Sequence, residues 1–176
     1  MIYNFVGYYS LIFGFLIGLL LFYYSYKNFN NPNLLDKKIL SFTFLQLLFV
    51  VISFLSLIFS FVISDFSNET VFNNSHTTKP LFYKISGTWG NHEGSLLLWL
   101  LVLTLFIFIF LVSTKNQPVK YKILTLVFQE IIILGFFIFL IKTSNPFNYL
   151  FPTPEEGLGL NPILQDPALA IHPPIL

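Results

Sequence analysis

Long apolar runs dominate the sequence, and polar residues gather in the stretches between them. Four of these runs are long enough to cross the hydrocarbon core of a bilayer, which takes about 20 residues in a helix. They cover residues 5–26, 40–63, 96–112 and 121–141. They lack the alternation and turn spacing of barrel strands, and a backbone in lipid must satisfy its own hydrogen bonds. The pattern therefore predicts an all-α polytopic membrane protein with four transmembrane helices.

The chain divides into a helical part and a tail. Residues 1–142 are predicted to form a four-helix membrane bundle, in which the polar loop 64–95 joins the second and third helices. Two short apolar patches in this loop, residues 71–72 and 81–85, predict either a small hairpin or a segment on the membrane surface. Residues 143–176 form a proline-rich tail.

The composition agrees with a membrane protein and excludes several other classes. Hydrophobic residues make up 55% of the chain and charged residues only 10%, against about 25% charged in a soluble domain. All nine basic residues are lysines and the net charge is +1, so there is no basic surface of the kind that binds nucleic acid. The absence of cysteine excludes disulfides, thiolate metal sites and thiol nucleophiles within this chain.

Lysines are spread unevenly over the predicted connections. The first and third connections contain Lys27, Lys37, Lys38, Lys115, Lys120 and Lys122, whereas the loop 64–95 and the tail contain Lys79, Lys84 and Lys142. Cytoplasmic loops carry an excess of lysine, so the first and third connections are expected inside. The loop 64–95, the tail and both termini are then expected on the outer face.

Small and polar residues interrupt three of the predicted helices. Gly14 and Gly18 have the spacing that lets a neighbouring helix approach closely. The span 40–63 carries serine, threonine and glutamine side chains that can bond to another helix or to their own backbone. Glu130 is the only acidic residue in a predicted span, and such a group is a candidate functional site. It is either part of a proton relay or a carboxyl that faces a partner helix.

The last seventeen residues, LNPILQDPALAIHPPIL, combine four prolines with one histidine. Proline fixes φ, removes a backbone donor and favours extended geometry in the residue before it, so this segment is expected to be a stiff, shaped loop. His172 is followed by Pro173 and Pro174, which hold it on that loop. A histidine held in this way is an axial metal ligand, a proton carrier or an ordinary surface residue.

Both tryptophans lie in one stretch, WGNHEGSLLLW, at the start of the third predicted helix. Asn or Ser can cap that helix, and Glu93 is favoured near its N-terminus. In this interpretation Trp89 and Trp99 are amphipathic anchors at the membrane boundary. In the alternative, His92 and Glu93 hold a hydrogen bond to a propionate or to a partner protein. The third histidine, His76, lies in a polar loop and is expected to be solvated.

These two stretches resemble the CcmF family of cytochrome c haem lyases. The resemblance extends to FVISDF after the second predicted helix, to TSNPF at residues 143–147 and to the spacing of the four helices. It covers essentially the whole chain. It implies a protein that takes haem from a haem chaperone on the outer membrane face. The haem is then presented to reduced cysteines of apocytochrome c, so that thioether bonds form with its vinyl groups.

The resemblance also implies roles for residues of the tail. The histidine of the family's HPP motif is one of two outer-face histidines that ligate the incoming haem, and it corresponds to His172. Pro173 and Pro174 would fix its direction. Gln165 and Asp166 are candidates for hydrogen bonds that orient its ring. The metal expected at this site is the haem iron alone.

The sequence also departs from the family. Several features of the family have no counterpart in these 176 residues. They are its fifth helix, its tryptophan-rich haem platform, its second outer-face histidine and its two intramembrane histidines. For Trp89, His92 and Glu93 the family offers a recurring motif without an assigned role. Haem would therefore be bound transiently and shared with a partner chain. The expected partners are chains that supply the platform and the remaining histidines, a haem chaperone, apocytochrome c and the lipid bilayer.

Two functions follow from this resemblance. The chain is either the N-terminal subunit of a haem lyase assembled from several chains, without a complete site of its own, or a structural subunit of a larger inner-membrane respiratory assembly. Its abundant Phe, Ile, Asn, Lys and Tyr have A/T-rich codons, and this bias indicates an organellar or otherwise A/T-biased genome. The expected location is the mitochondrial inner membrane, with a bacterial plasma membrane as the alternative.

Overall fold

The computed structural model describes residues 2–30, 37–114, 116–159, 161, 166–168 and 170–171. The helices named in this part of the chain are α1 (Ile2–Lys27), the 3-10 turn η1 (Asn28–Asn30), α2 (Lys37–Val62), α3 (Glu69–Asn74), α4 (Leu81–Gly87), α5 (His92–Ser113) and α6 (Val119–Lys142). Four of them, α1, α2, α5 and α6, are long and apolar enough to cross a membrane. The prediction of an all-α polytopic membrane protein is confirmed.

The long helices extend a few residues beyond the apolar runs that predict them. Backbone hydrogen bonds continue past the point where the side chains become polar, so hydropathy alone underestimates the helix ends. α5 begins at His92 instead of residue 96 because Asn91 caps it. α6 begins directly after Pro118, whose fixed φ and missing N–H suit the start of a helix.

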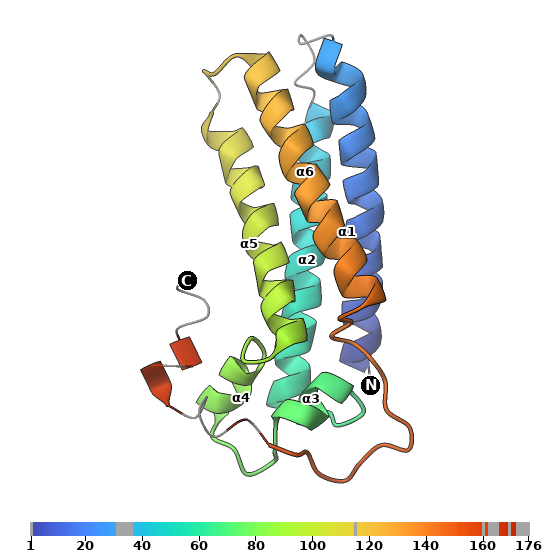
Figure 1. The fold of residues 1–176 in the computed structure, drawn as a ribbon, viewed down its shortest axis with the longest axis vertical. Helices are drawn as coiled ribbons and strands as arrows, with labels where there is room; N and C mark the ends of the chain where they lie inside the picture. The colour runs from blue at the N-terminus through green and yellow to red at the C-terminus, as the bar shows by residue number, and fades with distance from the viewer. Residues whose placement is uncertain are drawn as a thin grey trace.

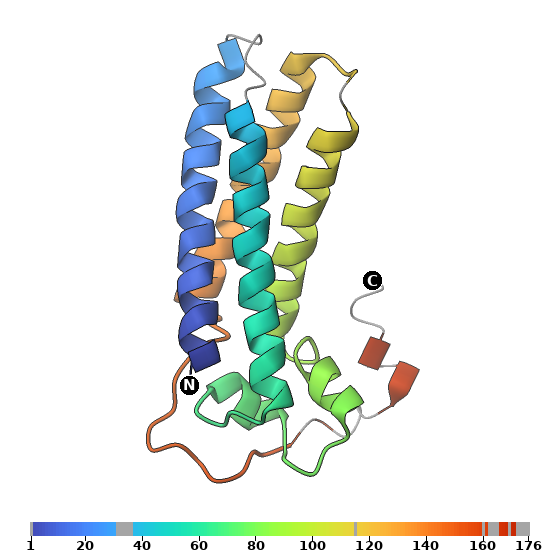
Figure 2. The ribbon, with the colours of Figure 1, turned by 180° about the vertical axis from the view of Figure 1, so that it is seen from behind.

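The four long helices stand side by side (Figures 1 and 2). α1 and α5 end, and α2 and α6 begin, at the same end of this bundle. At the opposite end, which we call the loop end, lie α3, α4 and the segment that follows α6. The described residues of the loop 64–95 and those that directly follow α6 therefore lie at the same end of the bundle. That this end is on the outer membrane face stays a prediction.

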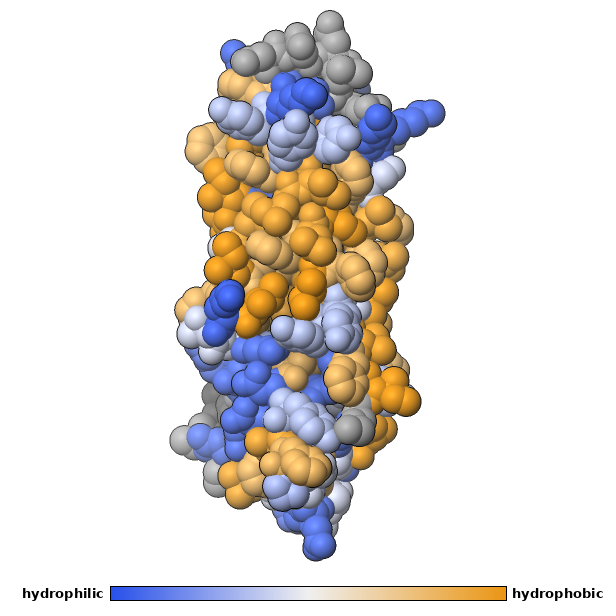
Figure 3. Space-filling view, turned by 90° about the vertical axis from the view of Figure 1, so that its right-hand side faces the viewer, coloured by the Kyte–Doolittle hydropathy of each residue, from blue (hydrophilic) through white to orange (hydrophobic). Residues whose placement is uncertain are grey.

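On the face that Figure 3 shows, apolar side chains form a broad belt over the middle of the bundle, and polar side chains gather towards its two ends. Exposed aromatic and aliphatic residues on all four long helices contribute to this belt, for example Phe13, Phe59, Phe106 and Phe128. In water this surface would be costly, since burying apolar surface contributes about 25 cal/mol per Å². In a bilayer it faces lipid, so the belt agrees with integral membrane insertion.

Glycines on α1 let the other helices pack closely against it. A Cβ at Gly14 would lie 3.1 Å from Cζ of Phe137 on α6, and a Cβ at Gly18 would lie 2.6 Å from Nε2 of Gln46 on α2. Near the loop end, the Ser53 hydroxyl donates to the Gly7 carbonyl at 3.0 Å. The small residues of α1 therefore face its neighbours, as their spacing predicts.

The loop between α2 and α5 forms two short helices where the sequence suggested a hairpin. Asn68 caps α3 by accepting a hydrogen bond from Val71 N at 3.0 Å, and α4 begins after Pro80. In the described part of the loop there is a single isolated β-bridge, between Asn68 and Tyr149 of the tail. Of the two alternatives, the hairpin was therefore wrong, because patches this short have no readable periodicity and the helix start signals decided the outcome. The other alternative, a segment on the membrane surface, stays a prediction.

Candidate functional site

The entrance to α5 is a compact network built from the WGNHEGS residues. The Asn91 side chain accepts a hydrogen bond from Gly94 N at 2.7 Å and donates to the Gly87 carbonyl at 2.7 Å. The Ser95 hydroxyl donates to the Trp89 carbonyl at 2.6 Å. These bonds satisfy groups that a helix N-terminus otherwise leaves without partners. The predicted cap of this helix is therefore present.

Gly94 is required by a close approach of backbone to backbone. A Cβ at this position would lie 1.6 Å from the Thr88 carbonyl oxygen. No side-chain rotation could relieve that overlap, because the obstructing atom belongs to the turn that enters α5. The glycine after Glu93 thus lets the chain fold back tightly at the loop end.

Trp89 connects this entrance to the tail. Its indole Nε1 donates a hydrogen bond to the Ala170 carbonyl at 2.8 Å, although 81 residues separate the two in sequence. Ala170 is buried, and the Trp89 ring packs against the hydrophobic core. Trp89 thus makes a specific contact with the tail, and its role as an anchor at the membrane boundary stays a prediction. Trp99, in contrast, is 48% exposed on the apolar belt, where an anchoring role fits.

Most of the tail residues singled out from the sequence lie outside the described residues. These are Gln165, His172, Pro173 and Pro174. Asp166 is described and exposed. Its carboxylate accepts a hydrogen bond from Ala168 N at 2.8 Å and its carbonyl accepts one from Ala170 N at 2.9 Å. Asp166 therefore shapes the turn that presents the Ala170 carbonyl to Trp89.

His92 and Glu93 lie next to different features in the first turn of α5. The exposed His92 ring lies edge-on to Phe139 of α6, with 6.3 Å between the ring centroids. Phe139 belongs to an apolar hollow of about 410 Å³ between α5 and α6, which Leu96 and Gly135 also line. Glu93 instead lines a polar pocket of about 140 Å³ beside α3. Their adjacency in sequence therefore does not make them one site.

Glu130 lies apart from the loop end, inside the bundle. Its side chain is fully buried and its Oε1 accepts a hydrogen bond from Gln46 Nε2 at 2.6 Å. Gly18 provides the space for this pair. The carboxyl thus faces α2 of the same chain.

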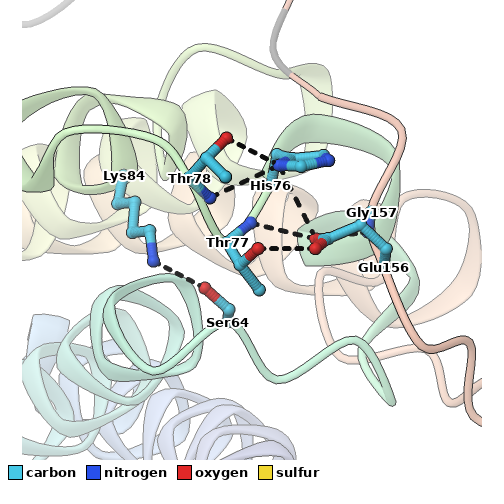
Figure 4. A network of polar contacts seen from close by, with 7 residues as sticks. All are labelled: Ser64, His76, Thr77, Thr78, Lys84, Glu156 and Gly157. Carbon is cyan, nitrogen blue, oxygen red and sulfur yellow. Dashed lines mark hydrogen bonds and ion pairs between the residues drawn. The ribbon is translucent and has the colours of Figure 1, made fainter.

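A polar network joins the loop to the tail and was not predicted from the sequence (Figure 4). It consists of His76, Thr77, Glu156 and Gly157, and we call it the clasp. Glu156 accepts hydrogen bonds from the Thr77 hydroxyl at 2.5 Å, from Thr77 N at 2.9 Å and from Gly157 N at 3.0 Å. The Thr77 hydroxyl is the main cause that lowers the pKa of Glu156 to about 2. His76 Nδ1 lies 3.9 Å from the same carboxylate, so His76 is part of this clasp and is not simply solvated.

The tail is also tied to the loop through its backbone. Leu150 N donates to the Ser67 carbonyl at 2.8 Å, and Leu158 N donates to the Phe72 carbonyl at 2.8 Å. Asn68 adds a side-chain bond to the Pro146 carbonyl at 2.9 Å. The tail therefore follows α3 along the loop end before it reaches Trp89.

Comparison with known proteins places the entrance and the tail in one family. Residues 89–176, which contain both, match the profile of the family described as cytochrome C assembly protein. The chain belongs to this family. The match begins at Trp89 and runs through α5 and α6 to the end of the tail, so it includes both partners of the Trp89–Ala170 contact.

Individual relatives support the assignment. The chain is 52% identical over 129 residues to the cytochrome c-type biogenesis protein CycK of Rhizobium meliloti, which covers 73% of this chain and 19% of the relative. It is 40% identical over 136 residues to the cytochrome c-type biogenesis protein CcmF of Escherichia coli, covering 77% of this chain and 21% of the relative. The chain spans about a fifth of the length of these curated relatives.

A solved structure is similar as well. The chain resembles the cytochrome c haem lyase CcmF with a TM-score of 0.73 and 25% identity, over 83% of this chain and 25% of that one. The family identified from the two motifs is thereby confirmed. Most of this chain's fold is thus also found within a longer chain of this family.

The described residues provide only part of what a haem site would need. In the segments that the structure describes, no group of three or more His, Asp or Glu side chains could hold a metal ion. Of the two described histidines, His76 is engaged in the clasp and His92 packs against Phe139. Trp89 does contact the tail at Ala170, two residues before His172 in the sequence.

Proposed function

We propose that this chain is the N-terminal subunit of a cytochrome c haem lyase complex. In this role it receives haem on the outer membrane face and helps to position it for thioether attachment to apocytochrome c. The hydrogen bond from Trp89 to the Ala170 carbonyl carries the proposal. It joins the tail at Ala170 to the WGNHEGS motif, with which the family match begins, at the loop end of the bundle.

In this proposal His172 supplies one axial imidazole to the haem iron. Pro173 and Pro174 restrict the backbone after it, and the anchored Ala170 restricts the backbone before it. Gln165 and Asp166 lie close enough in sequence to help orient the imidazole, as groups around a metal ligand commonly do. The second axial ligand and the tryptophan-rich platform come from another chain.

The chain's own contribution is one of positioning. Haem supplies the reactive vinyl groups and apocytochrome c supplies the thiols, so the attachment chemistry belongs to them. Holding the reacting groups in a productive orientation can lower the barrier substantially. His92 is the described residue best placed to donate a hydrogen bond to a haem propionate or to a partner protein, because its ring is exposed at the loop end.

The location and partners follow the same proposal. The lysine distribution puts both termini and the loop end on the outer face, and the codon bias favours the mitochondrial inner membrane, although the relatives named above are bacterial. On that face the chain would meet a haem chaperone, apocytochrome c and the chains that complete the haem site.

The decisive experiment replaces His172 in the intact complex. We expect His172→Ala to lower the haem content of the purified complex and the yield of holocytochrome c, while the chain still accumulates in the membrane. His76→Ala is the matched control, because it removes a loop-end histidine that takes no part in the proposed ligation. Normal haem attachment with His172→Ala would overturn the proposal.

A structural role is the second candidate. In this role the chain serves a larger inner-membrane respiratory assembly and takes no part in haem attachment. The chains that co-purify with it distinguish the two functions. A complex that contains this chain but no chain with a tryptophan-rich segment would favour the structural role.

A further inference from the structure

The Gln46–Glu130 pair leaves two oxygen atoms without partners in the interior of the bundle. Both side chains are completely buried, and a single hydrogen bond joins them, from Gln46 Nε2 to Glu130 Oε1 at 2.6 Å. Gln46 Oε1 and Glu130 Oε2 are shielded from solvent and have no hydrogen-bond partner among the described residues. Buried polar atoms are satisfied in nearly all cases, so these two oxygens indicate a hydrogen-bond donor between them.

An ionised Glu130 would be an isolated charge. No positively charged side chain of the described residues pairs with its carboxyl. The nearest lysine of α6, Lys122, lies eight residues earlier in the chain, which is about 12 Å along a helix. The other three long helices carry charged residues only in their first or last turns. An unpaired carboxylate in an apolar interior is so unfavourable that the group takes up a proton instead.

The surroundings leave little room for any other donor. Gly18 of α1 lies directly against the pair, since a Cβ there would lie 2.6 Å from Gln46 Nε2 and 2.7 Å from Glu130 Oε1. Calcium and magnesium take about six or more oxygen ligands, and among the described residues no group of three or more His, Asp or Glu could hold a metal ion. A single proton needs no added volume and satisfies both oxygens at once.

We propose that Glu130 holds a proton on Oε2 and donates it to Oε1 of Gln46, so that the two side chains form a closed acid–amide pair. A protonated carboxyl has one O–H donor and keeps an acceptor oxygen, and a primary amide has a carbonyl acceptor and N–H donors, so the two groups are complementary. The terminal torsions of Glu and Gln are broad, which lets their planar groups align. The proton comes from the surrounding water and changes the charge of Glu130 from −1 to zero, and no other bond forms or breaks.

The closed pair is a proton-binding site that retains its proton. A relay would need a further group to which Glu130 passes the proton, whereas here the acceptor is an amide oxygen, which shares the hydrogen without becoming charged. The neutral form is also the one that suits a membrane interior, where ionised side chains are costly. The pair lies inside the bundle and away from the loop end, so its protonation is independent of the proposed role in haem attachment.

Infrared spectroscopy of the full chain in detergent at neutral pH tests the proposal, because a carboxylic acid and a carboxylate absorb at different frequencies. We expect a carboxylic-acid band that shifts when the chain is made with ¹³C-labelled glutamate and that is lost in Glu130→Gln. The labelling measurement needs no variant, so it decides the question even if Glu130→Gln does not fold. A spectrum of the unmodified chain without a glutamic-acid band would overturn the proposal, as would a band that persists in Glu130→Gln.

Glu156→Gln is the matched control. The hydrogen bond from the Thr77 hydroxyl is the main cause that lowers the pKa of Glu156 to about 2, so this residue is a carboxylate at neutral pH. The variant should lose carboxylate absorbance and keep the carboxylic-acid band. Loss of the acid band in Glu156→Gln would assign the proton to the wrong residue and overturn the proposal.

Gln46→Met tests the hydrogen bond within the pair. Methionine has a similar volume but no amide, so the acid band of Glu130 should move to higher frequency when the contacts with the amide are lost. An acid band at the same frequency in this variant and in the unmodified chain would show that the proton is not shared with Gln46, and the closed pair would be wrong.

Discussion

Gln46 of α2 donates a hydrogen bond to Glu130 of α6 at 2.6 Å, in the interior of the helix bundle. Both side chains are completely buried, and Gln46 Oε1 and Glu130 Oε2 have no hydrogen-bond partner among the described residues. Hydrogen bonds between membrane helices contribute about 0.6 kcal/mol on average. Their alternative is an unpaired polar group in an apolar interior, so this pair fixes how α2 and α6 face each other.

Removing one partner of this pair should lower the free energy of unfolding by more than the hydrogen bond itself contributes. Glu130→Leu leaves the Gln46 amide unpaired, and we expect the free energy of unfolding in detergent to fall by about 1–3 kcal/mol. Glu130→Gln keeps an acceptor for Gln46, so its free energy of unfolding should fall by less than half as much. If both variants unfold at the same denaturant concentration as the original chain, the pair does not stabilise the bundle.

Gly18 should tolerate no larger side chain, because it makes room for the same pair. A Cβ there would lie 2.6 Å from Gln46 Nε2 and 2.7 Å from Glu130 Oε1. We expect Gly18→Ala to lower the stability by about 1–3 kcal/mol, as overpacking of a core usually does. The measurement is equilibrium unfolding in detergent.

Gly135 provides the control for this substitution. It lies in α6, and a Cβ there would meet no atom within 4 Å. Gly135→Ala should therefore be neutral, or slightly stabilising because alanine favours a helix over glycine by up to about 1 kcal/mol. Equal losses at Gly18 and Gly135 would show that helix propensity, and not the space beside Gln46, controls the effect.

Trp89→Phe should release the tail without changing the bundle. Phenylalanine keeps the ring but lacks the N–H that donates to Ala170. A hydrogen bond contributes about 1 kcal/mol, so we expect the tail to open about fivefold more often. Hydrogen exchange of peptides that cover residues 160–176 measures this opening. Trp99→Phe removes an exposed indole and should leave the exchange unchanged; equal exchange in both variants would contradict the anchoring role of Trp89.

The clasp between Glu156 and Thr77 should persist in mildly acidic solution. Its hydrogen bonds, chiefly that from the Thr77 hydroxyl, lower the pKa of Glu156 from 4.5 to about 2. A carboxyl with a lowered pKa adds stability above its unfolded pKa, and that contribution is lost as the pH falls through the folded pKa. The clasp should therefore be intact at pH 5 and weaken between about pH 4.5 and pH 2.

The amide shift of Thr77 in an NMR titration reports this transition. Thr77→Ala removes the main cause of the shift, so the Glu156 pKa should move back towards 4.5. A Glu156 midpoint near 4.5 in the unmodified chain would show that the clasp does not form in solution.

Much of the fold could be predicted because each transmembrane helix is encoded locally. The apolar runs place α1, α2, α5 and α6 within a few residues of their observed ends. Local chemistry was also sufficient to predict the cap of α5, where Asn91 lies three residues before Gly94 and accepts a hydrogen bond from its N–H. The short helices α3 and α4 were not predicted, because six or seven residues contain too few turns to show a helical period.

The sequence by itself determined the four membrane helices, the uneven distribution of lysines, the helix entrance at Asn91 and the two motifs that characterise the family. The tertiary structure decided which distant groups meet: Trp89 with Ala170 across 81 residues, Gln46 with Glu130 across 84, and Glu93 with the pocket beside α3. Hydropathy and capping act between neighbours in the chain, so they can be read directly from the sequence. These long-range contacts depend on how the helices pack and turn towards one another, and only the folded bundle defines that.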